Sequence, residues 1–428
     1  MFVQIHMLQS VPPGNVNRDD TGQPKRCLFG GVTRGRISSQ CLKRNIRHST
    51  QFEDAFGKDL GSRTKFLPRM VADALQAADA GIPQEESEEI MQALAGRFKK
   101  AERGGGAGED QDDDDDQDGS QSSPSASGTS GQTGQLVFFP PPFATRIAEL
   151  IKEFKKSSPA SYNKFIRPST RISQTDQPAI NAARDQFLDS ITLASKELTV
   201  DIALFGRMTT SDLVINVDAA SQVAHAISTH EVITESDYFT AMDDEQIRFA
   251  TTQTEEAGAA FLGSGDTETF FNSAVYYKYL NLDLDAVGKH LHISDPERLA
   301  QIAGALVNAA ALTHPTGKQN AFANPTFPEL VLVETSRTKR PVSYANAFLQ
   351  PVEGGAARNL MTESATALGW YIDEVAIAFV PSDVKRALLA VGAGSITPQI
   401  DHQRAKTLAE LVQAVEQMCI PQEAGVTS

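Results

Sequence analysis

Apolar side chains recur along this chain with two periods, and together they predict a mixed α+β fold. Residues 2–8 alternate loosely between apolar and polar positions, which is typical of a strand. Alternation or short apolar runs predict further strands over 200–205, 270–283, 330–334 and 374–380. Helical spacing predicts helices over 218–228, 297–314 and 405–418 and through most of 65–100 and 141–196. Strands and helices interspersed in this way favour a sheet with helices on one face.

The N-terminal region predicts a functional loop followed by a capped helix. Residues 10–33 are rich in Pro, Gly, Asn and Asp, and a loop of this length in a compact domain is usually functional. Ser38 and Ser39 supply an N-cap for a helix over residues 39–50. Its apolar side chains at Leu42 and Ile46 lie four apart and would face the core. The donor-rich stripe of this helix comprises Gln40, Lys43 and Arg47, with Arg44 beside it.

Composition favours a soluble globular protein. The 428 residues contain no run of eighteen apolar side chains, so we expect no membrane span. The first eight residues lack the basic start of a secretory signal, and three scattered cysteines give neither a disulfide framework nor a metal site. These features favour a cytoplasmic protein. Nucleotide-binding, hydrolase and zinc-peptidase motifs are missing from the sequence, so we expect no cofactor and no metal.

Charge is distributed unevenly along the chain. The formal net charge is −15, yet residues 104–134 hold eight acidic side chains and no basic one. This Gly-, Asp- and Ser-rich stretch has almost no apolar residues, which predicts a disordered insertion over 104–135. A tolerated surface insertion explains it, and repulsion of competing nucleic acid is the functional alternative.

The first 49 residues are basic by contrast. Eight Lys/Arg stand against two Asp there, a local charge of +6. Several separated donors beside a helix N-terminus suit a phosphate backbone, which needs contacts along its length. From composition alone, a solvated helix face remains the alternative.

Five blocks of the sequence, in order, resemble one protein family. They are Asn17-Arg18-Asp19-Asp20 with Arg36-Ile37-Ser38-Ser39-Gln40, then Val200-Asp201-Ile202-Ala203-Leu204-Phe205-Gly206-Arg207-Met208, then 222–230, Gly317-Lys318-Gln319 and Ser343-Tyr344-Ala345-Asn346-Ala347-Phe348. The chain resembles the CasC-type backbone subunit of Cascade, the CRISPR surveillance complex of subtype I-E. The likeness spans most of the chain and is weakest over 60–195.

The resemblance implies a hand-shaped protein. Its palm would be a ferredoxin-like sheet of the RNA-recognition-motif type, carrying an inserted helical fingers domain and a protruding thumb. The expected boundaries are 1–60 for the first part of the palm, 61–198 for the fingers, 199–245 for the thumb and 246–428 for the rest of the palm.

The resemblance also implies a function. Copies would stack head to tail along a CRISPR guide RNA (crRNA), kink it at regular intervals and present it for pairing with target DNA. The other partners would be further Cascade subunits and the effector helicase-nuclease. No bond chemistry is expected of such a subunit, so it would not be an enzyme.

Site residues follow from the same resemblance. The palm positions expected to contact the guide are Arg18, Lys25, Ser38, Gln40, Lys43, Arg44 and Arg47. Met208 would wedge against bases, although its sequence context alone predicts a core residue. Lys318 and Gln319 are further backbone contacts or part of a plain surface loop.

Two rival interpretations remain open at this stage. A metal-dependent ribonuclease could use Asp19 or Asp20, as related type III backbone subunits use an acidic loop residue, although Asp19 could equally orient Arg18 or cap a turn. A monomeric, generic RNA-binding protein is the second rival. His225 and His230 lie five apart, a poor spacing for a metal pair on one helix, and a structural role is expected for Thr229 and His230.

Overall fold

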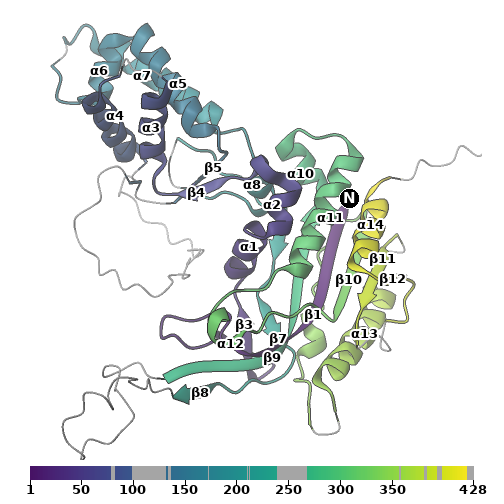
Figure 1. The fold of residues 1–428 in the computed structure, drawn as a ribbon. Helices are drawn as coiled ribbons and strands as arrows, with labels where there is room; N and C mark the ends of the chain where they lie inside the picture. Colours follow the sequence, from purple (N-terminus) through teal and green to yellow (C-terminus); the bar gives the residue numbers. More distant parts are fainter. Residues whose placement is uncertain are drawn as a thin grey trace, which may run out of the picture.

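A long central strand, β1 (Phe2–Gly14), organises the fold. It pairs antiparallel with β9 (Glu268–Asp283) on one side and β10 (Leu330–Ser336) on the other. Its first eight residues are buried, because elements cover both faces of the sheet. The strand order is β12-β11-β10-β1-β9-β7-β3-β2, with β6 and β8 also pairing with β9 (Figure 1).

The computed structural model describes most of the chain. The described residues are 1–78, 82–98, 132–133, 136–171, 173–209, 211, 213–238, 268–355, 358–379, 383–392 and 398–421. The predicted disordered insertion therefore lies outside them, except for Gln132 and Thr133. Thr133 is buried, and its amide donates to the carbonyl of Lys65 at 2.8 Å.

The centre of the sheet has a β-α-β-β-α-β order. The elements in sequence are β1, α1 (Ser39–Arg47), β6 (Ser221–Val223), β9, α11 (Pro296–Leu312) and β10. Both neighbours of β1 are antiparallel, and β6 lies beyond β9, which is the ferredoxin-like arrangement. The predicted α+β class is confirmed.

The edges of the sheet are built from short strands. One edge is β11 (Lys385–Ala390) and β12 (Gln403–Ala405), and the other is β7 (Ala226–Ser228), β3 (Val32–Ile37) and β2 (Arg26–Phe29). Figure 1 shows β9 continuing past the sheet, where it pairs with β8 (Glu235–Tyr238). Residues 239–245, the end of the expected thumb, lie outside the described residues.

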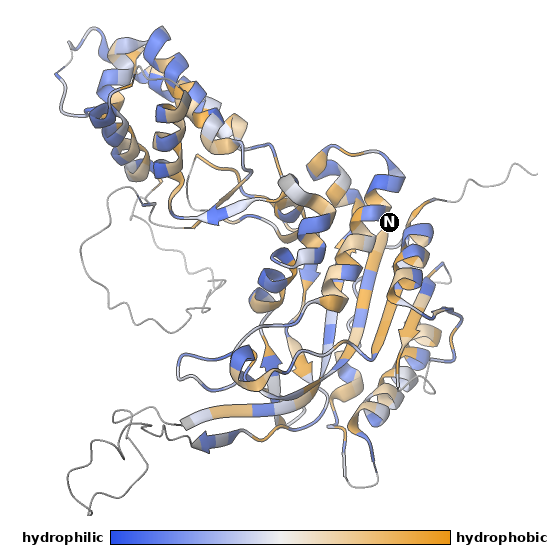
Figure 2. Ribbon diagram, viewed as in Figure 1, coloured by the Kyte–Doolittle hydropathy of each residue, from blue (hydrophilic) through white to orange (hydrophobic). Residues whose placement is uncertain are grey.

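Helices cover both faces of the sheet, not one as the sequence predicted. The larger core packs α1, α2 (Thr50–Phe56), α10 (Leu284–Leu291), α11 and α14 (Leu408–Cys419) against one face. The second core packs α13 (Leu360–Phe379) and the turn η2 (Ala345–Phe348) against the other. Figure 2 shows the consequence, since the central strands are mostly hydrophobic while the helices alternate. No helix in the described ranges is long and apolar enough to cross a bilayer.

A separate helical unit carries its own core, as predicted for 65–100 and 141–196. It consists of α3 (Leu67–Ala78), α4 (Gln84–Arg97), α5 (Phe143–Ser157), α6 (Pro159–Ile166) and α7 (Gln177–Ala194). The rings of Phe154 and Phe187 stack there with centroids 4.5 Å apart. A small sheet of β4 (Ser62–Thr64) and β5 (Val137–Phe139) connects the unit to the rest of the chain (Figure 1).

Four local predictions are wrong. Residues 10–33 are not one loop, because β1 continues to Gly14 and a β2–β3 hairpin follows. The buried run expected as a strand over 200–205 is the helix α8 (Val200–Phe205). The helix expected over 218–228 is instead β6 and β7, which pair with β9, and the strand expected over 374–380 is the end of α13. Short apolar runs do not distinguish strand from helix, so distant partners decided these cases.

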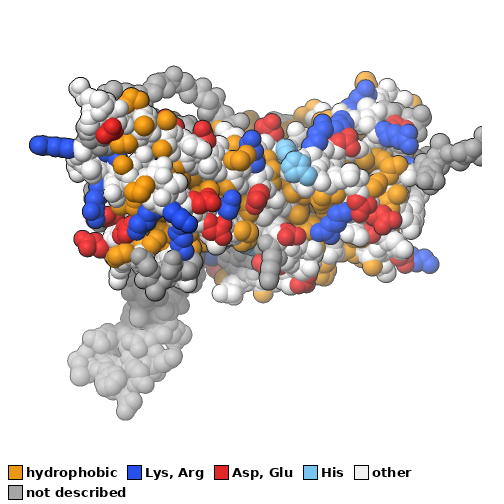
Figure 3. Space-filling view, turned by 90° about the horizontal axis from the view of Figure 1, so that it is seen from above, with side chains coloured by type: hydrophobic (Ala, Val, Ile, Leu, Met, Phe, Trp, Pro, Cys, Tyr) orange, Lys and Arg blue, Asp and Glu red, His pale blue; other side chains and the backbone are white. Residues whose placement is uncertain are grey.

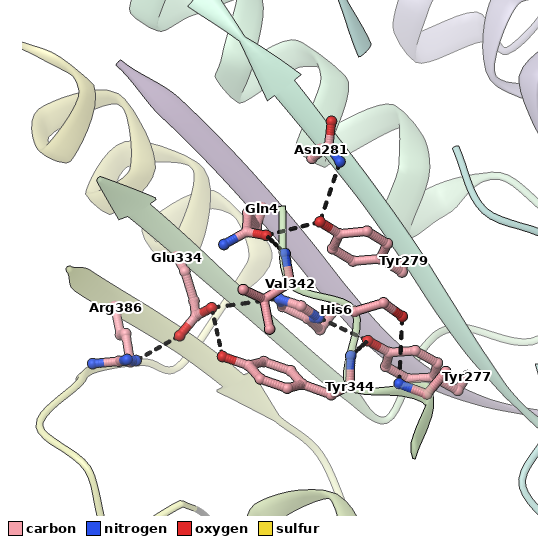
Figure 4. Close-up of polar contacts among 11 residues, drawn as sticks. Gln4, His6, Tyr277, Tyr279, Asn281, Glu334, Val342, Tyr344 and Arg386 are labelled. Atoms are coloured by element: carbon pink, nitrogen blue, oxygen red, sulfur yellow. Dashed lines mark hydrogen bonds and ion pairs between the residues drawn. The ribbon is translucent and has the colours of Figure 1, made fainter. Parts of the chain in front are cut away.

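A buried polar network lies on the α13 face of the sheet (Figure 4). Glu334 accepts from Arg386 Nε at 2.6 Å and from the hydroxyl of Tyr344 at 2.9 Å, with His6 Nε2 3.5 Å away. Burial alone would raise the pKa of Glu334, but His6 and Arg386 together lower it to about 2. The network therefore holds an ionised carboxylate in the core between the sheet and α13.

Candidate nucleic-acid interface

Helix α1 is positioned by the loop that precedes it. The hydroxyl of Ser38 accepts from the amide of Cys41 at 3.2 Å, as an N-cap does, and the Ser38 amide donates to Asn17 Oδ1 at 2.8 Å. Leu42 and Ile46 are buried, as predicted. The N-terminus of α1 is thus fixed to the loop at residues 15–25.

A cluster of positive charge lies at this helix N-terminus. His225, between β6 and β7, accepts at Nδ1 from the Ser39 amide and from Arg36 Nη1, both at 3.3 Å. Burial lowers the pKa of His225, and the nearby charges of Arg36, Lys25 and Lys43 lower it further. Arg36 therefore contacts an imidazole that favours the neutral form, and Lys25 and Lys43 lie near enough to act on it electrostatically. We call Lys25, Arg36, Lys43 and His225 the His225 cluster.

The His225 cluster is suited to anions. Half-buried cations beside a helix N-terminus favour negative groups, because the helix dipole and the side-chain charges act in the same direction. By comparison, the face seen in Figure 3 carries acidic and basic side chains intermixed. Arg44, on the same helix, is exposed, and Gln40 accepts from the Ser39 hydroxyl at 3.2 Å.

Arg47 has a structural role that the sequence did not predict. Its Nε lies 3.2 Å from Oδ2 of Asp201 on α8, and its guanidinium stacks over Phe138, 4.6 Å from the ring centroid. The Arg47 side chain is 10% exposed and that of Asp201 is 0% exposed. The pair with Asp201 and the near-complete burial of both side chains give Arg47 a role in the fold, and its expected contact with the guide stays a prediction. Ser38 is likewise occupied as the helix cap and is 5% exposed.

One member of the basic N-terminal segment is also structural. Arg34 is fully buried and donates to the carbonyl oxygens of Phe29, Ser228 and Phe348 at 3.2, 3.0 and 2.7 Å. Arg34 thus adds to the local charge of the segment without being available to a ligand, whereas Arg36 and His225 belong to the site and were not predicted from the sequence. Arg36 lies two positions further along β3, on the same side of the strand as Arg34, so strand alternation could not separate the roles of the two arginines.

The loop that contains Asp19 is closed by its own side chain. Asp19 Oδ1 accepts from the Thr21 amide at 3.0 Å, the Thr21 hydroxyl at 2.7 Å and the Gln23 amide at 2.9 Å. This places Asp19 as a turn-forming residue next to half-buried Arg18, while Asp20 is exposed. Within the described ranges, no three His, Cys, Asp or Glu side chains gather to hold a metal ion. The ribonuclease alternative stays a prediction without structural support here.

Lys318 and Gln319 approach the same loop from a distant part of the chain. They begin the short helix α12 (Gln319–Phe322), and Lys318 is exposed. A Cβ added to Gly317 would come within 2.6 Å of the carbonyl oxygens of Asn15 and Val16, so only glycine allows this approach. Figure 1 shows α12 beside the loop after β1. The structure therefore brings Lys318 to the edge of the His225 cluster's supporting loop.

Met208 lies elsewhere and is 74% exposed. It follows Arg207, which is buried and donates to the carbonyl oxygens of Ile215, Phe138 and Ser195 at 2.9, 3.1 and 2.7 Å. The core position that its sequence context predicted is wrong. A large apolar side chain is instead displayed on a well-anchored loop.

Comparisons with known proteins agree on a single group. Two solved structures match nearly the whole chain. The first, a chain of a "CRISPR RNA-guided surveillance complex, pre-nicking", is 24% identical with a TM-score of 0.70, covering 98% of this chain and 100% of that one. The second, from a "CRISPR RNA-guided surveillance complex", is 21% identical with a TM-score of 0.63, covering 97% and 99%. No curated protein matches.

These structural likenesses show a shared fold. A family model described as Cas_CT1975, CT1975-like protein, matches residues 3–414, which is nearly the full chain. The chain therefore belongs to the CT1975-like family of Cas proteins.

Proposed function

We propose that this protein is a guide-RNA-binding backbone subunit of a type I CRISPR effector complex, of subtype I-E. The observation that carries the proposal is the His225 cluster, where three cations lie near a helix N-terminus on a chain of net charge −15. Family membership and the fold shared with chains of CRISPR surveillance complexes support it.

The chemistry of the cluster fits a guide whose sequence varies. Lys and Arg contact phosphates without reading bases, which leaves the base edges free to pair with a target. The contacts in the proposal are Arg18, Lys25, Arg36, Gln40, Lys43, Arg44, Lys318 and Gln319. The partners in the proposal are the crRNA, target DNA paired to it, further copies of this chain, other Cascade subunits and the effector helicase-nuclease.

Met208 takes the second role in the proposal. Its exposed thioether would wedge between bases at a kink without selecting their identity. Copies stacked head to tail would form an open helical assembly along the guide. The chain would then bind and shape RNA in the cytoplasm rather than cut it.

The test is a Lys43→Ala variant compared with Lys156→Ala. Lys156 is an exposed lysine on α5, so its variant changes the net charge equally without touching the cluster. Losing one charge-assisted contact should weaken guide binding at least about tenfold for every guide sequence. The slope of log K against log salt should fall by about 0.7. Equal affinities of the two variants, or a loss that depends on guide sequence, would contradict the proposal.

The ribonuclease alternative is tested separately. Assembled complexes are incubated with labelled complementary RNA and Mg²⁺, with and without Asp19→Asn. We expect intact RNA in both samples, because the Asp19 carboxylate already accepts three hydrogen bonds in its turn. Cleavage that disappears in the variant would establish the enzyme instead. Cooperative binding that depends on guide length would exclude the monomeric alternative.

A further inference from the structure

A buried lysine lies beneath the segment that carries Lys318. Lys278, on β9, is 3% exposed, and its ammonium donates to Oε1 of Gln9 on β1, which is 0% exposed. A cavity of about 10 Å³ adjoins Lys278, and its other lining side chains are apolar or neutral. Burying an ammonium without an acidic partner is costly. Burial accordingly lowers the pKa of Lys278 to about 8.

The amide of Gln9 connects both ends of segment 313–326. Its Nε2 donates to the carbonyl of Thr326 at the end of the segment and lies 3.5 Å from Nδ1 of His314 near the start. The Thr326 hydroxyl also donates to the carbonyl of Ser10 at 2.6 Å. One side chain on the central strand therefore ties the segment to the sheet.

The charge on Lys278 fixes the orientation of that amide. An ammonium group only donates hydrogen bonds, so it requires the oxygen of Gln9 to face it. The NH₂ of Gln9 must then point toward Thr326. A neutral amine can also accept, so it would allow the amide to turn round. The segment would then lose the bond from Gln9 to the Thr326 carbonyl and keep the weaker tether from the Thr326 hydroxyl to Ser10.

Segment 313–326 in turn packs on the loop that holds α1. Gly317 lies directly against the carbonyl oxygens of Asn15 and Val16, and the next residue, Asn17, accepts from the Ser38 amide at 2.8 Å. Lys318 has a left-handed backbone with φ of 52°, which costs about 1–2 kcal/mol for a residue with a side chain. The segment therefore depends on its tethers to keep this conformation.

We infer that Lys278 is a positioning residue for the guide-binding surface: by fixing the amide of Gln9, it holds segment 313–326, and with it Lys318, against the loop before α1. The role in binding rests on the proposed function. The tether itself is a property of the free chain, so the two can be tested apart.

The test compares Gln9→Glu with a matched control, Gln222→Glu. Glutamate at position 9 still accepts from the ammonium but cannot donate to Thr326. Gln222 is exposed on β6 and only accepts in its contact with Asn281, so its variant should behave as wild type. Hydrogen exchange of peptides covering 313–326 is measured in the free chain, and guide-RNA affinity is measured in parallel. We expect exchange in Gln9→Glu to be about tenfold faster, with affinity reduced as far as in Lys318→Ala.

A pH series with Lys278→Met gives a second, independent readout. The groups that face the ammonium are Gln9 from β1, Cys41 from α1 and His314 after α11. Burial and Lys278 lower the pKa of His314 to about 4, so His314 stays neutral from pH 7 to 9.5. Corrected for intrinsic rates, exchange of 313–326 should rise over this range in wild type and stay constant in Lys278→Met.

The tether would be refuted if hydrogen exchange of 313–326 in Gln9→Glu were as slow as in the wild type, or if exchange in the wild-type chain did not change with pH. Faster exchange in Gln9→Glu with undiminished RNA affinity, while Lys43→Ala binds weakly, would overturn the positioning role. Normal RNA binding by Lys43→Ala would instead contradict the proposed function. In that case the hydrogen-exchange data alone would show whether Gln9 and Lys278 hold segment 313–326.

Discussion

The ion pair between Arg47 and Asp201 allows a direct test of whether Arg47 on α1 stabilises the fold or contacts phosphate. Replacing Arg47 with Met removes the charge and keeps most of the side-chain volume beside Phe138. Asp201 then stays 0% exposed with no cation 3.2 Å away. Breaking a buried pair in this way typically costs about 3–5 kcal/mol.

The structure places the expected cost at the lower end of that range. Oδ1 of Asp201 keeps three donors: the Gly61 amide at 2.9 Å, the Thr199 hydroxyl at 2.7 Å and the Ile202 amide at 3.1 Å. We therefore expect Arg47→Met to lower the free energy of unfolding by about 3 kcal/mol. The double variant with Asp201→Asn should recover part of this loss, because it no longer buries an unpaired charge.

Urea unfolding followed by circular dichroism measures both values, with Lys43→Met as the matched control. Lys43 is half-buried, and within the described ranges no carboxylate forms an ion pair with it, so its replacement should change the free energy of unfolding by at most about 0.5 kcal/mol. A loss below about 1 kcal/mol in Arg47→Met, together with RNA binding as weak as in Lys43→Met, would refute the structural assignment. Arg47 would then be a phosphate contact, as the resemblance implied.

Two other predictions follow from buried and exposed side chains respectively. Glu334 has a pKa of about 2 in the fold against 4.5 ordinarily, so the stability that its carboxylate contributes is complete above pH 4.5 and is lost as the pH falls through 2. The unfolding midpoint of Glu334→Gln should therefore lack this acid dependence. An acid profile equal to that of the wild type would contradict the role of the network. At about 1.4 kcal/mol per pKa unit the effect is roughly 3 kcal/mol. Met208→Ala should leave the free energy of unfolding nearly unchanged and guide affinity within about twofold of wild type, since the side chain is 74% exposed. The variant should, however, lower the chemical reactivity of displaced guide nucleotides in assembled complexes. Unaltered nucleotide reactivity would count against a wedge.

The hydrophobic pattern of the sequence predicted those elements whose structure is determined by residues close to one another in the chain. The cap at Ser38 and the buried pair Leu42 and Ile46 located α1, and the alternation of 270–283 located β9. The run 200–205 could not be assigned in this way, because all its apolar positions are buried except one and neither period stands out. Its helix begins after Thr199 and ends at Gly206, where φ is 79°. Those two residues were the available signals.

The sequence predicted that the candidate site is basic, but it predicted only some of the residues that form it. The basic segment pointed to α1, and Lys25 and Lys43 both lie close enough to His225, at the start of α1, to lower its pKa. The sequence could not separate Arg47 from Lys43, because the partner that engages Arg47 is Asp201, 154 residues away. His225 was missed for the same reason, since it reaches the helix N-terminus only through the pairing of β7 with β3 and β9.

The central position of β1 has a consequence for synthesis of the chain. This strand is synthesised long before its two partners, because β9 and β10 begin at residues 268 and 330. At about 5–20 residues per second, β1 waits roughly 13–50 seconds for the start of β9, its first neighbour. The helical unit of α3–α7 can fold during that interval, because its core is its own. Nascent chains should therefore carry a folded helical unit and an unpaired β1. The open edges of β1 favour capture by a chaperone or association with a neighbouring nascent chain before β9 is made.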